Sequence, residues 1–98
     1  MIFNGTDTRL SADAQKALDA VIGKLGKSEN LRVQLMAYAA GEGLTSSKAR
    51  RISLSRALSV RSHLIENGIR STRIDVRALG DKAEGEQKNR VDVNIVER

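Results

Sequence analysis

The chain has 98 residues, of which 40% are hydrophobic and 30% charged, so it is long enough for one globular domain and too short for two. It contains no cysteine, which excludes disulfides and thiolate metal sites, and no apolar run approaches the ~18 residues of a membrane-spanning helix. The net charge of +5 favours acidic partners or simply a solvated basic surface, while one Phe and one Tyr leave little on which nucleic-acid bases could stack.

The first elements in chain order are a short strand and a helix. "MIF" is a strand candidate, and the polar turn "NGTDTR" follows it. Ser11 is a suitable N-cap for a helix that closes at Gly26. Apolar residues recur at helical spacing between these two positions, at Ala14, Leu18, Val21, Ile22 and Leu25.

A strand is predicted next, because apolar and polar residues alternate along "LRVQLMAY", residues 31 to 38. The glycine-containing loop "AAGEGLTSS" then leads into a long helix, which Ser46 or Ser47 caps and which runs to about Asn67, with Gly68 as its terminator. Two further strands, "RIDVRAL" and "RVDVNIVE", are separated by a charged loop.

This order of elements predicts the fold. Strands joined through helices favour parallel pairing by right-handed crossovers, whereas the last two strands are expected to pair antiparallel. We therefore predict an α+β fold: a βαβαββ two-layer sandwich in which a mixed sheet of about four strands carries two helices on one face. The whole chain, residues 1–98, is expected to form a single domain.

Residue types that carry out catalysis are scarce. His63 is the one histidine, and it has no second histidine or cysteine with which to hold a metal. The serines fit no nucleophile-elbow pattern, and "AAGEGL" matches neither a phosphate-binding loop nor a dinucleotide fingerprint. Asp81, Glu84 and Glu86 lie in a polar loop, where carboxylates are expected to be solvated. The sequence predicts a protein that is not an enzyme and uses no cofactor or metal.

Arg56 is the residue that needs an explanation. In a helical projection it falls on the apolar side of the long helix, between Ile52 and Val60. A guanidinium is seldom placed among apolar neighbours without an acidic partner or a ligand. Two interpretations are open: the side chain lays its methylenes on apolar surface and reaches water, or it binds a carboxylate bidentately at the end of the strand that precedes the helix.

Three stretches resemble one protein family. "LRVQLMAYAAGEG", "RRISLSRALSVRSHLIENGIRSTRIDVRALG" and "NRVDVNIVE" are similar to the C-terminal domain of OmpA, a peptidoglycan-binding module shared with the peptidoglycan-associated lipoprotein and flagellar stator proteins. The family pattern includes a strand ending Gly-Tyr-Thr-Asp, then Asn-x-x-Leu-Ser-x-x-Arg-Ala, and later Arg-Arg-Val-x-Ile. The resemblance covers almost the whole chain and implies a βαβαββ sandwich.

The resemblance also implies roles for particular residues. Arg56 matches the family's arginine, and Ser53 matches the serine three positions before it. In the family this arginine grips the free carboxylate of diaminopimelate in the peptidoglycan stem peptide, which would make Arg56 a carboxylate clamp. Tyr38 matches the tyrosine of Gly-Tyr-Thr-Asp, and Arg90 matches the closing motif.

The sequence departs from the family pattern at the ligand site. The acidic residue that partners the arginine and holds the ligand's ammonium falls at Ala40, the threonine at Ala39 and the asparagine at Ala49. Glu42 would supply a carboxylate if the slightly longer loop shifts the alignment. Because diaminopimelate is zwitterionic at its free end, losing one charge-assisted hydrogen bond is expected to weaken binding about ten- to a hundredfold, or ~1.5–3 kcal/mol.

Three interpretations follow. The first is a non-enzymatic module on the periplasmic face of the bacterial envelope, cut from a longer protein, which anchors that protein to peptidoglycan and meets a membrane only through a segment outside this chain. The second is a domain that keeps the fold, has lost the ligand and binds an envelope protein. The third, nucleic-acid binding, has only the charge in its favour, and we expect no nucleic-acid partner.

Overall fold

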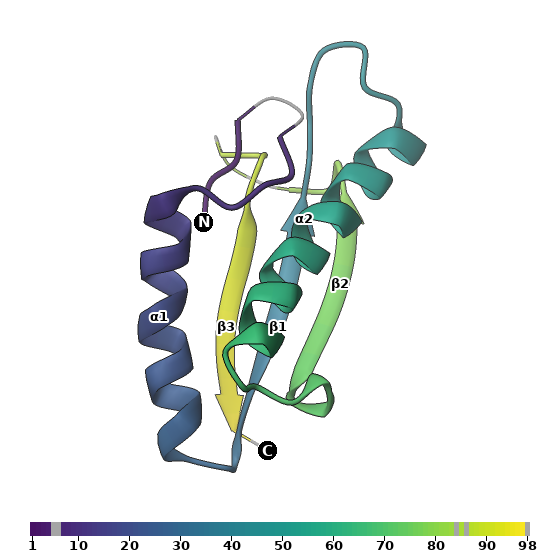
Figure 1. Cartoon of the computed structure of the whole chain (residues 1–98). Coiled ribbons are helices and arrows are strands. Elements are labelled where there is room, and N and C mark those ends of the chain that lie inside the picture. The colour runs from purple at the N-terminus through teal and green to yellow at the C-terminus, as the bar shows by residue number, and fades with distance from the viewer. Residues whose placement is uncertain (5–6, 84, 86, 98) are drawn as a thin grey trace.

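The computed structural model describes residues 1–4, 7–83, 85 and 87–97. The described residues form two long helices, a short 3-10 helix and three strands, which are arranged in two layers (Figure 1). In chain order these elements are α1 (Ala12–Lys27), β1 (Leu31–Tyr38), α2 (Ser46–Glu66), η1 (Ser71–Arg73), β2 (Ile74–Gly80) and β3 (Val91–Glu97). The predicted α+β fold, with two helices and a mixed sheet, is confirmed.

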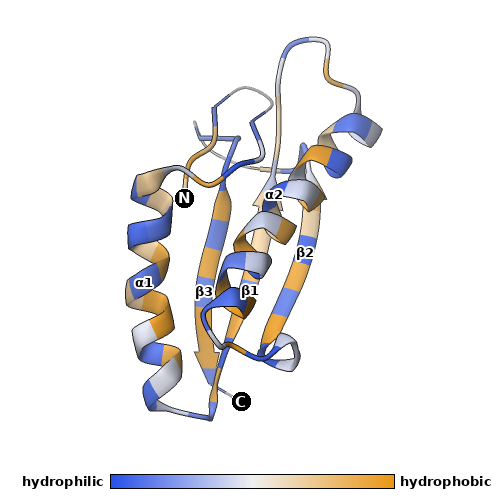
Figure 2. Cartoon of the chain, in the orientation of Figure 1, coloured by the Kyte–Doolittle hydropathy of each residue, from blue (hydrophilic) through white to orange (hydrophobic). Residues whose placement is uncertain are grey.

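The sheet has the strand order β2–β1–β3, with β1 in the centre. β1 runs parallel to β2, from the pair Val33↔Ile74 onward, and antiparallel to β3. Each strand alternates hydrophobic and hydrophilic residues (Figure 2), so the sheet has one apolar face and one polar face. The helices cover the apolar face, and the polar face carries groups such as the Arg32–Asp75 ion pair.

The core lies between the helices and the apolar face of the sheet. Its completely buried members come mainly from α1, β1 and α2, because each of these elements places its apolar residues on one side, and Val91 at the start of β3 joins them. They include Leu18, Leu25, Val33, Leu35, Ala37, Ala57, Val60 and Leu64. Neither long helix, nor any other helix within the described residues, is long and apolar enough to cross a membrane.

The strand expected at "MIF" is not formed, apart from one isolated bridge. Of its residues, Ile2 forms an isolated antiparallel bridge with Arg90, and Phe3 is buried and donates its amide to the carbonyl of Asn89. The described part of the chain therefore contains three strands, where the sequence suggested about four. "MIF" serves mainly to place the Phe3 ring in the core.

The predicted pairing of the last two strands is wrong. β2 and β3 flank β1 and do not touch each other as neighbours in the sheet. The connection between them passes the carboxyl end of β1, where Tyr38 donates its amide to the Arg90 carbonyl and Ala39 donates to the Gly80 carbonyl. β1 carries the most completely buried side chains of the three strands, and the central position is the one that buries a strand along both edges.

The N-cap of α2 also differs from the prediction. Thr45 caps the helix, because its hydroxyl accepts a hydrogen bond from the amide of Lys48. Ser46 is instead the first helical residue, and its hydroxyl donates to Asp81 at 2.9 Å. α1, in contrast, begins as predicted, with the Ser11 hydroxyl accepting from the amide of Ala14.

Arg73, just before β2, contacts the end of α1 and the start of β1. From η1, its guanidinium donates to the carbonyls of Leu25, Ser28 and Leu31, at distances of 2.7–3.1 Å. These carbonyls lie at the end of α1 and in the turn that leads into β1, where backbone acceptors lack helical partners. Arg73 therefore caps α1 and holds the α1–β1 turn against the start of β2.

Candidate functional site

Arg56 lies in the middle of α2 and points toward the carboxyl end of β1. Its side chain has no exposed surface, and it is the largest fully buried side chain in the described part of the chain. The guanidinium therefore does not reach water, and of the two interpretations left open by the sequence the one in which Arg56 extends to solvent is wrong. The head group lies at one end of the core among hydrogen-bond acceptors and the Phe3 ring, and we call this cluster the Arg56 corner: Phe3, Asp7, Tyr38, Arg56 and Asn89.

The guanidinium of Arg56 is held by acceptors from three separate segments. Its Nε donates to the Asp7 carbonyl at 2.8 Å. Its Nη1 donates to the Tyr38 carbonyl at 3.1 Å and to Asn89 Oδ1 at 2.8 Å. The guanidinium carbon lies 5.1 Å from the centre of the Phe3 ring, within cation–π range. Arg56 thus joins the N-terminal segment, the end of β1 and the segment before β3.

Burial in the Arg56 corner affects the pKa of the guanidinium. Desolvation lowers the pKa of Arg56 from its ordinary value, and the nearby Asp7 carboxylate raises it again in part. An arginine remains protonated at any physiological pH even after such a shift. The corner is consequently a buried positive charge, which is stable only while its hydrogen-bond acceptors stay in place.

Asn89 organises the Arg56 corner, a role that sequence reasoning missed. Its Oδ1 accepts from Arg56 and also from the amide of Ala40 at 3.1 Å, while its Nδ2 donates to the Ala40 carbonyl at 2.9 Å. The side-chain amide therefore pairs with Ala40 as a neighbouring strand would. Its position directly before Arg90, in the stretch that resembles the family's closing motif, is the one signal that could have singled it out.

Tyr38 belongs to the Arg56 corner, and Ala39 and Ala40 follow it directly in the chain. Tyr38 contributes its carbonyl to Arg56, and its ring lies under the guanidinium of Arg90, 4.6 Å from the ring centre. Ala39 is completely buried, whereas Ala40 is half-buried. The structure thus brings the Tyr38 carbonyl to Arg56, and Asn89 links the backbone of Ala40 to the same guanidinium.

Ser53 and Glu42 lie outside the Arg56 corner. Ser53 is fully buried, donates to the Arg50 carbonyl at 2.8 Å and accepts from the Gly80 amide at 3.1 Å, so it fastens α2 to the end of β2. Gly80 has φ +60°, and a Cβ there would lie 3.2 Å from the Arg50 backbone. Glu42 is exposed in the loop after β1 and makes no ion pair within the described part of the chain.

The chain matches the OmpA family over residues 2–97, nearly its full length, and belongs to that family. No curated protein sequence matches the chain.

Solved structures with similar folds come from several bacteria. The OmpA-like domain of FopA1 from Francisella tularensis has 21% identity and a TM-score of 0.84, with 97% of this chain and 68% of that chain covered. The peptidoglycan-associated lipoprotein from Burkholderia pseudomallei has 19% identity and a TM-score of 0.84, with 97% and 87% covered. The C-terminal domain of Helicobacter pylori MotB has 15% identity and a TM-score of 0.78, with 99% and 82% covered.

Proposed function

We propose that this chain is a non-enzymatic module of the bacterial cell envelope that associates weakly with peptidoglycan at the Arg56 corner, on the periplasmic side. The observation that carries the proposal is the position of Arg56: it comes from α2 to the carboxyl end of β1 and lies beside Tyr38 and Ala40. This is where the family pattern puts a carboxylate clamp for diaminopimelate. Membership of the OmpA family over residues 2–97 supports the same assignment.

Two features of the corner make weak binding the expected result. A ligand carboxylate can contact the guanidinium only by replacing one of its internal acceptors, since Arg56 has no exposed surface. The Asp7 carbonyl belongs to an exposed residue and is the acceptor most easily displaced. The methyl group of Ala40 gives the ligand's ammonium no carboxylate, so that half of the zwitterion loses its partner.

The proposal is tested by an NMR titration of the labelled chain with a stem peptide that contains diaminopimelate. The matched control is the same peptide with lysine in place of diaminopimelate, which keeps the ammonium and lacks the second carboxylate. We expect shifts at residues 38–43 and 89–90, and at Arg56, with diaminopimelate only, at about millimolar affinity. Equal shifts with both peptides, or none, would refute a carboxylate clamp at this corner.

The same burial supports a second candidate function, a protein-interaction domain that keeps the OmpA fold without the ligand. In this case Arg56 stabilises the domain by joining three segments, and the partner is another envelope protein. This function would be favoured over the first if stem peptide caused no NMR shifts at the Arg56 corner and a protein segment bound elsewhere on the chain.

A further inference from the structure

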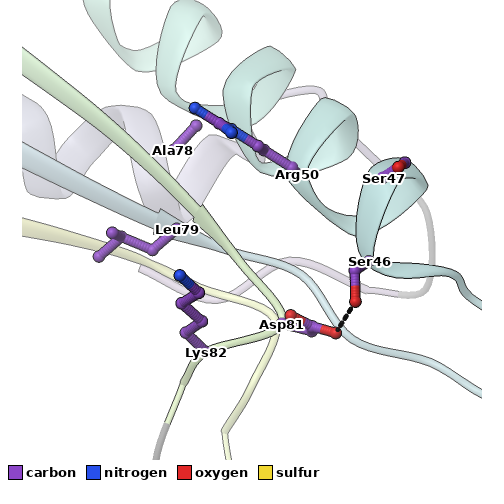
Figure 3. A pocket seen from close by; sticks show the side chains of 7 residues that line it. All are labelled: Ser46, Ser47, Arg50, Ala78, Leu79, Asp81 and Lys82. Carbon is purple, nitrogen blue, oxygen red and sulfur yellow. Dashed lines mark hydrogen bonds between the residues drawn. The ribbon is translucent and has the colours of Figure 1, made fainter.

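A groove runs along one edge of the molecule, between α2 and β2. One part of it has a volume of about 520 Å³ and is lined by Ser47, Arg50, Arg51, Leu54, Val76 and Ala78. A second part, about 400 Å³, shares Ser47, Arg50 and Ala78 with the first and adds Ser46, Leu79, Asp81 and Lys82 (Figure 3). Because the two parts share residues from both elements, they form one continuous feature, which we call the α2–β2 groove.

The part of the groove that Leu54, Val76 and Ala78 line is apolar. Leu54 of α2 lines this part and is 42% exposed, and Leu58, one turn further along the helix and outside the lining, is exposed to the same extent. Val76 and Ala78 of β2 are half-buried, because α2 covers the apolar face of this strand incompletely. These side chains leave an apolar strip that water contacts in the isolated chain.

The rim of the groove is positively charged. Arg50 and Arg51 line it from α2, and Figure 3 shows Arg50 extending from the helix toward Ala78. Lys82 lines it at the end of β2. The acidic side chain in the groove, Asp81, already accepts a hydrogen bond from the Ser46 hydroxyl. An occupant with carboxylates matches this rim, and one with ammonium groups does not.

The other wall of the groove is an open strand edge. β2 is at the end of the sheet, paired with β1 on one side, and no strand among the described residues pairs with its outer side. Such an edge presents backbone donors and acceptors that an added strand can pair with. A polypeptide satisfies this ladder, whereas a glycan strand does not.

We propose that the α2–β2 groove binds an extended, acidic segment of another protein, which adds to β2 as an edge strand. Alternate apolar side chains of the segment would contact Leu54, Val76 and Ala78, and its carboxylates would approach Arg50 and Arg51. A second copy of this chain is a poor occupant, because it would bring its own Arg50 and Arg51 to the same rim.

This surface is separate from the Arg56 corner. Residues two apart on a helix are ~200° apart around its axis, so Leu54 and Arg56 lie on nearly opposite sides of α2. The groove proposal therefore does not depend on peptidoglycan binding, and a variant in the groove leaves the corner untouched.

The test is an NMR and hydrogen-exchange titration of the chain with a blocked peptide of about eight residues that alternates valine and glutamate. A valine–lysine peptide controls for charge, and a valine–glutamate peptide N-methylated at alternate amides controls for backbone pairing. We expect the acidic peptide alone to shift residues 74–80 and to protect amides of β2 from exchange. Raised salt should weaken its binding.

A charge-reversal variant makes the test specific to the groove. Arg50→Glu combined with Arg51→Glu should weaken the acidic peptide about tenfold, since exposed charge pairs contribute modestly each. The control is Lys16→Glu with Lys24→Glu, which makes the same change in net charge on the exposed side of α1. Equal loss in both variants would overturn the proposal, as would equal binding of the N-methylated peptide. A dimer that sedimentation detects and the groove variant abolishes would also overturn it, because the occupant would then be a second copy.

Discussion

At the scale of single residues, Arg56 shows how a family signature can remain while its surroundings change. Its place on the apolar side of the helix could be read from the sequence, because helical spacing fixes which side chains face the sheet. Its acceptors could not be read, because the Asp7 carbonyl and the Asn89 amide arrive from segments 49 and 33 residues away in the chain. Only the folded arrangement of three segments reveals that the guanidinium is enclosed.

We predict that Arg56→Ala destabilises the chain by about 3–5 kcal/mol, because it leaves the acceptors of a buried network without their donor. Urea denaturation measures the loss in the free energy of unfolding. Arg51→Ala, at an exposed position on the same helix, is the control and should cost about 0.5 kcal/mol or less. A loss below ~1 kcal/mol for Arg56→Ala would mean that the network contributes little to stability.

The pKa shift of Arg56 sets a further expectation for pH dependence. Burial lowers the pKa of Arg56 in the folded state, so desolvating the charged guanidinium reduces the free energy of unfolding at every pH below that lowered pKa. The penalty is relieved only as the pH rises through the folded pKa toward the higher pKa of the unfolded state. The stability difference between the natural chain and Arg56→Met should therefore be constant between about pH 5 and pH 9. A difference that changes steadily across this range would show that a different group near the corner titrates.

At the scale of elements, periodicity was a reliable guide, and β1 and β2 pair parallel as predicted for strands joined through a helix, whereas the pairing of the last two strands was predicted wrongly. The bounds of α1, β1 and α2 agree closely with the predictions, because each element has a clear apolar period and a glycine or hydroxyl residue near an end. The loop between the last two strands does not encode whether those strands become neighbours. Thr45, Ser46 and Ser47 are all residue types that cap helices. In the folded chain Thr45 is the N-cap, and Ser46 instead donates a hydrogen bond to Asp81 in the tertiary structure.

The junction of α2 and β2 gives a prediction at this scale. Gly80→Ala should destabilise the chain by about 2 kcal/mol, because Gly80 has φ +60° and its new Cβ would meet the Arg50 backbone at 3.2 Å. Gly23→Ala is the matched control: Gly23 lies inside α1 with nothing within 4 Å of a new Cβ, so the change should stabilise by ~1 kcal/mol. Thermal unfolding of both variants checks the opposite signs, and equal shifts would contradict the account of this junction.

Arg73 stabilises the opposite end of the sheet, where α1 ends and β1 begins. Arg73→Met should cost about 2 kcal/mol, because the carbonyls of Leu25, Ser28 and Leu31 lose a charged donor. Hydrogen exchange should accelerate mainly in the turn between α1 and β1. Arg70→Met changes an exposed arginine nearby and should have little effect. If the two variants behave alike, Arg73 does not cap α1.

At the scale of the whole molecule, β1 organises both candidate surfaces. Its carboxyl end places the Tyr38 carbonyl against Arg56. Its pairing with one edge of β2 leaves the outer edge of β2 open beside α2. The overall architecture was predictable from the order and period of the elements together with the family resemblance. The open groove was not, because it depends on how completely α2 covers an edge strand, which no local pattern records.

The most direct measurement is a titration of the Ala40→Asp variant with diaminopimelate stem peptide beside the natural chain. Ala40 is half-buried, and its backbone is held by Asn89, so an aspartate there would stand next to Arg56 without changing the fold. The account predicts that the variant binds about ten- to a hundredfold more tightly, because the ligand's ammonium regains a charge-assisted partner. If neither chain binds at about millimolar peptide while both remain folded, the Arg56 corner is not a peptidoglycan site.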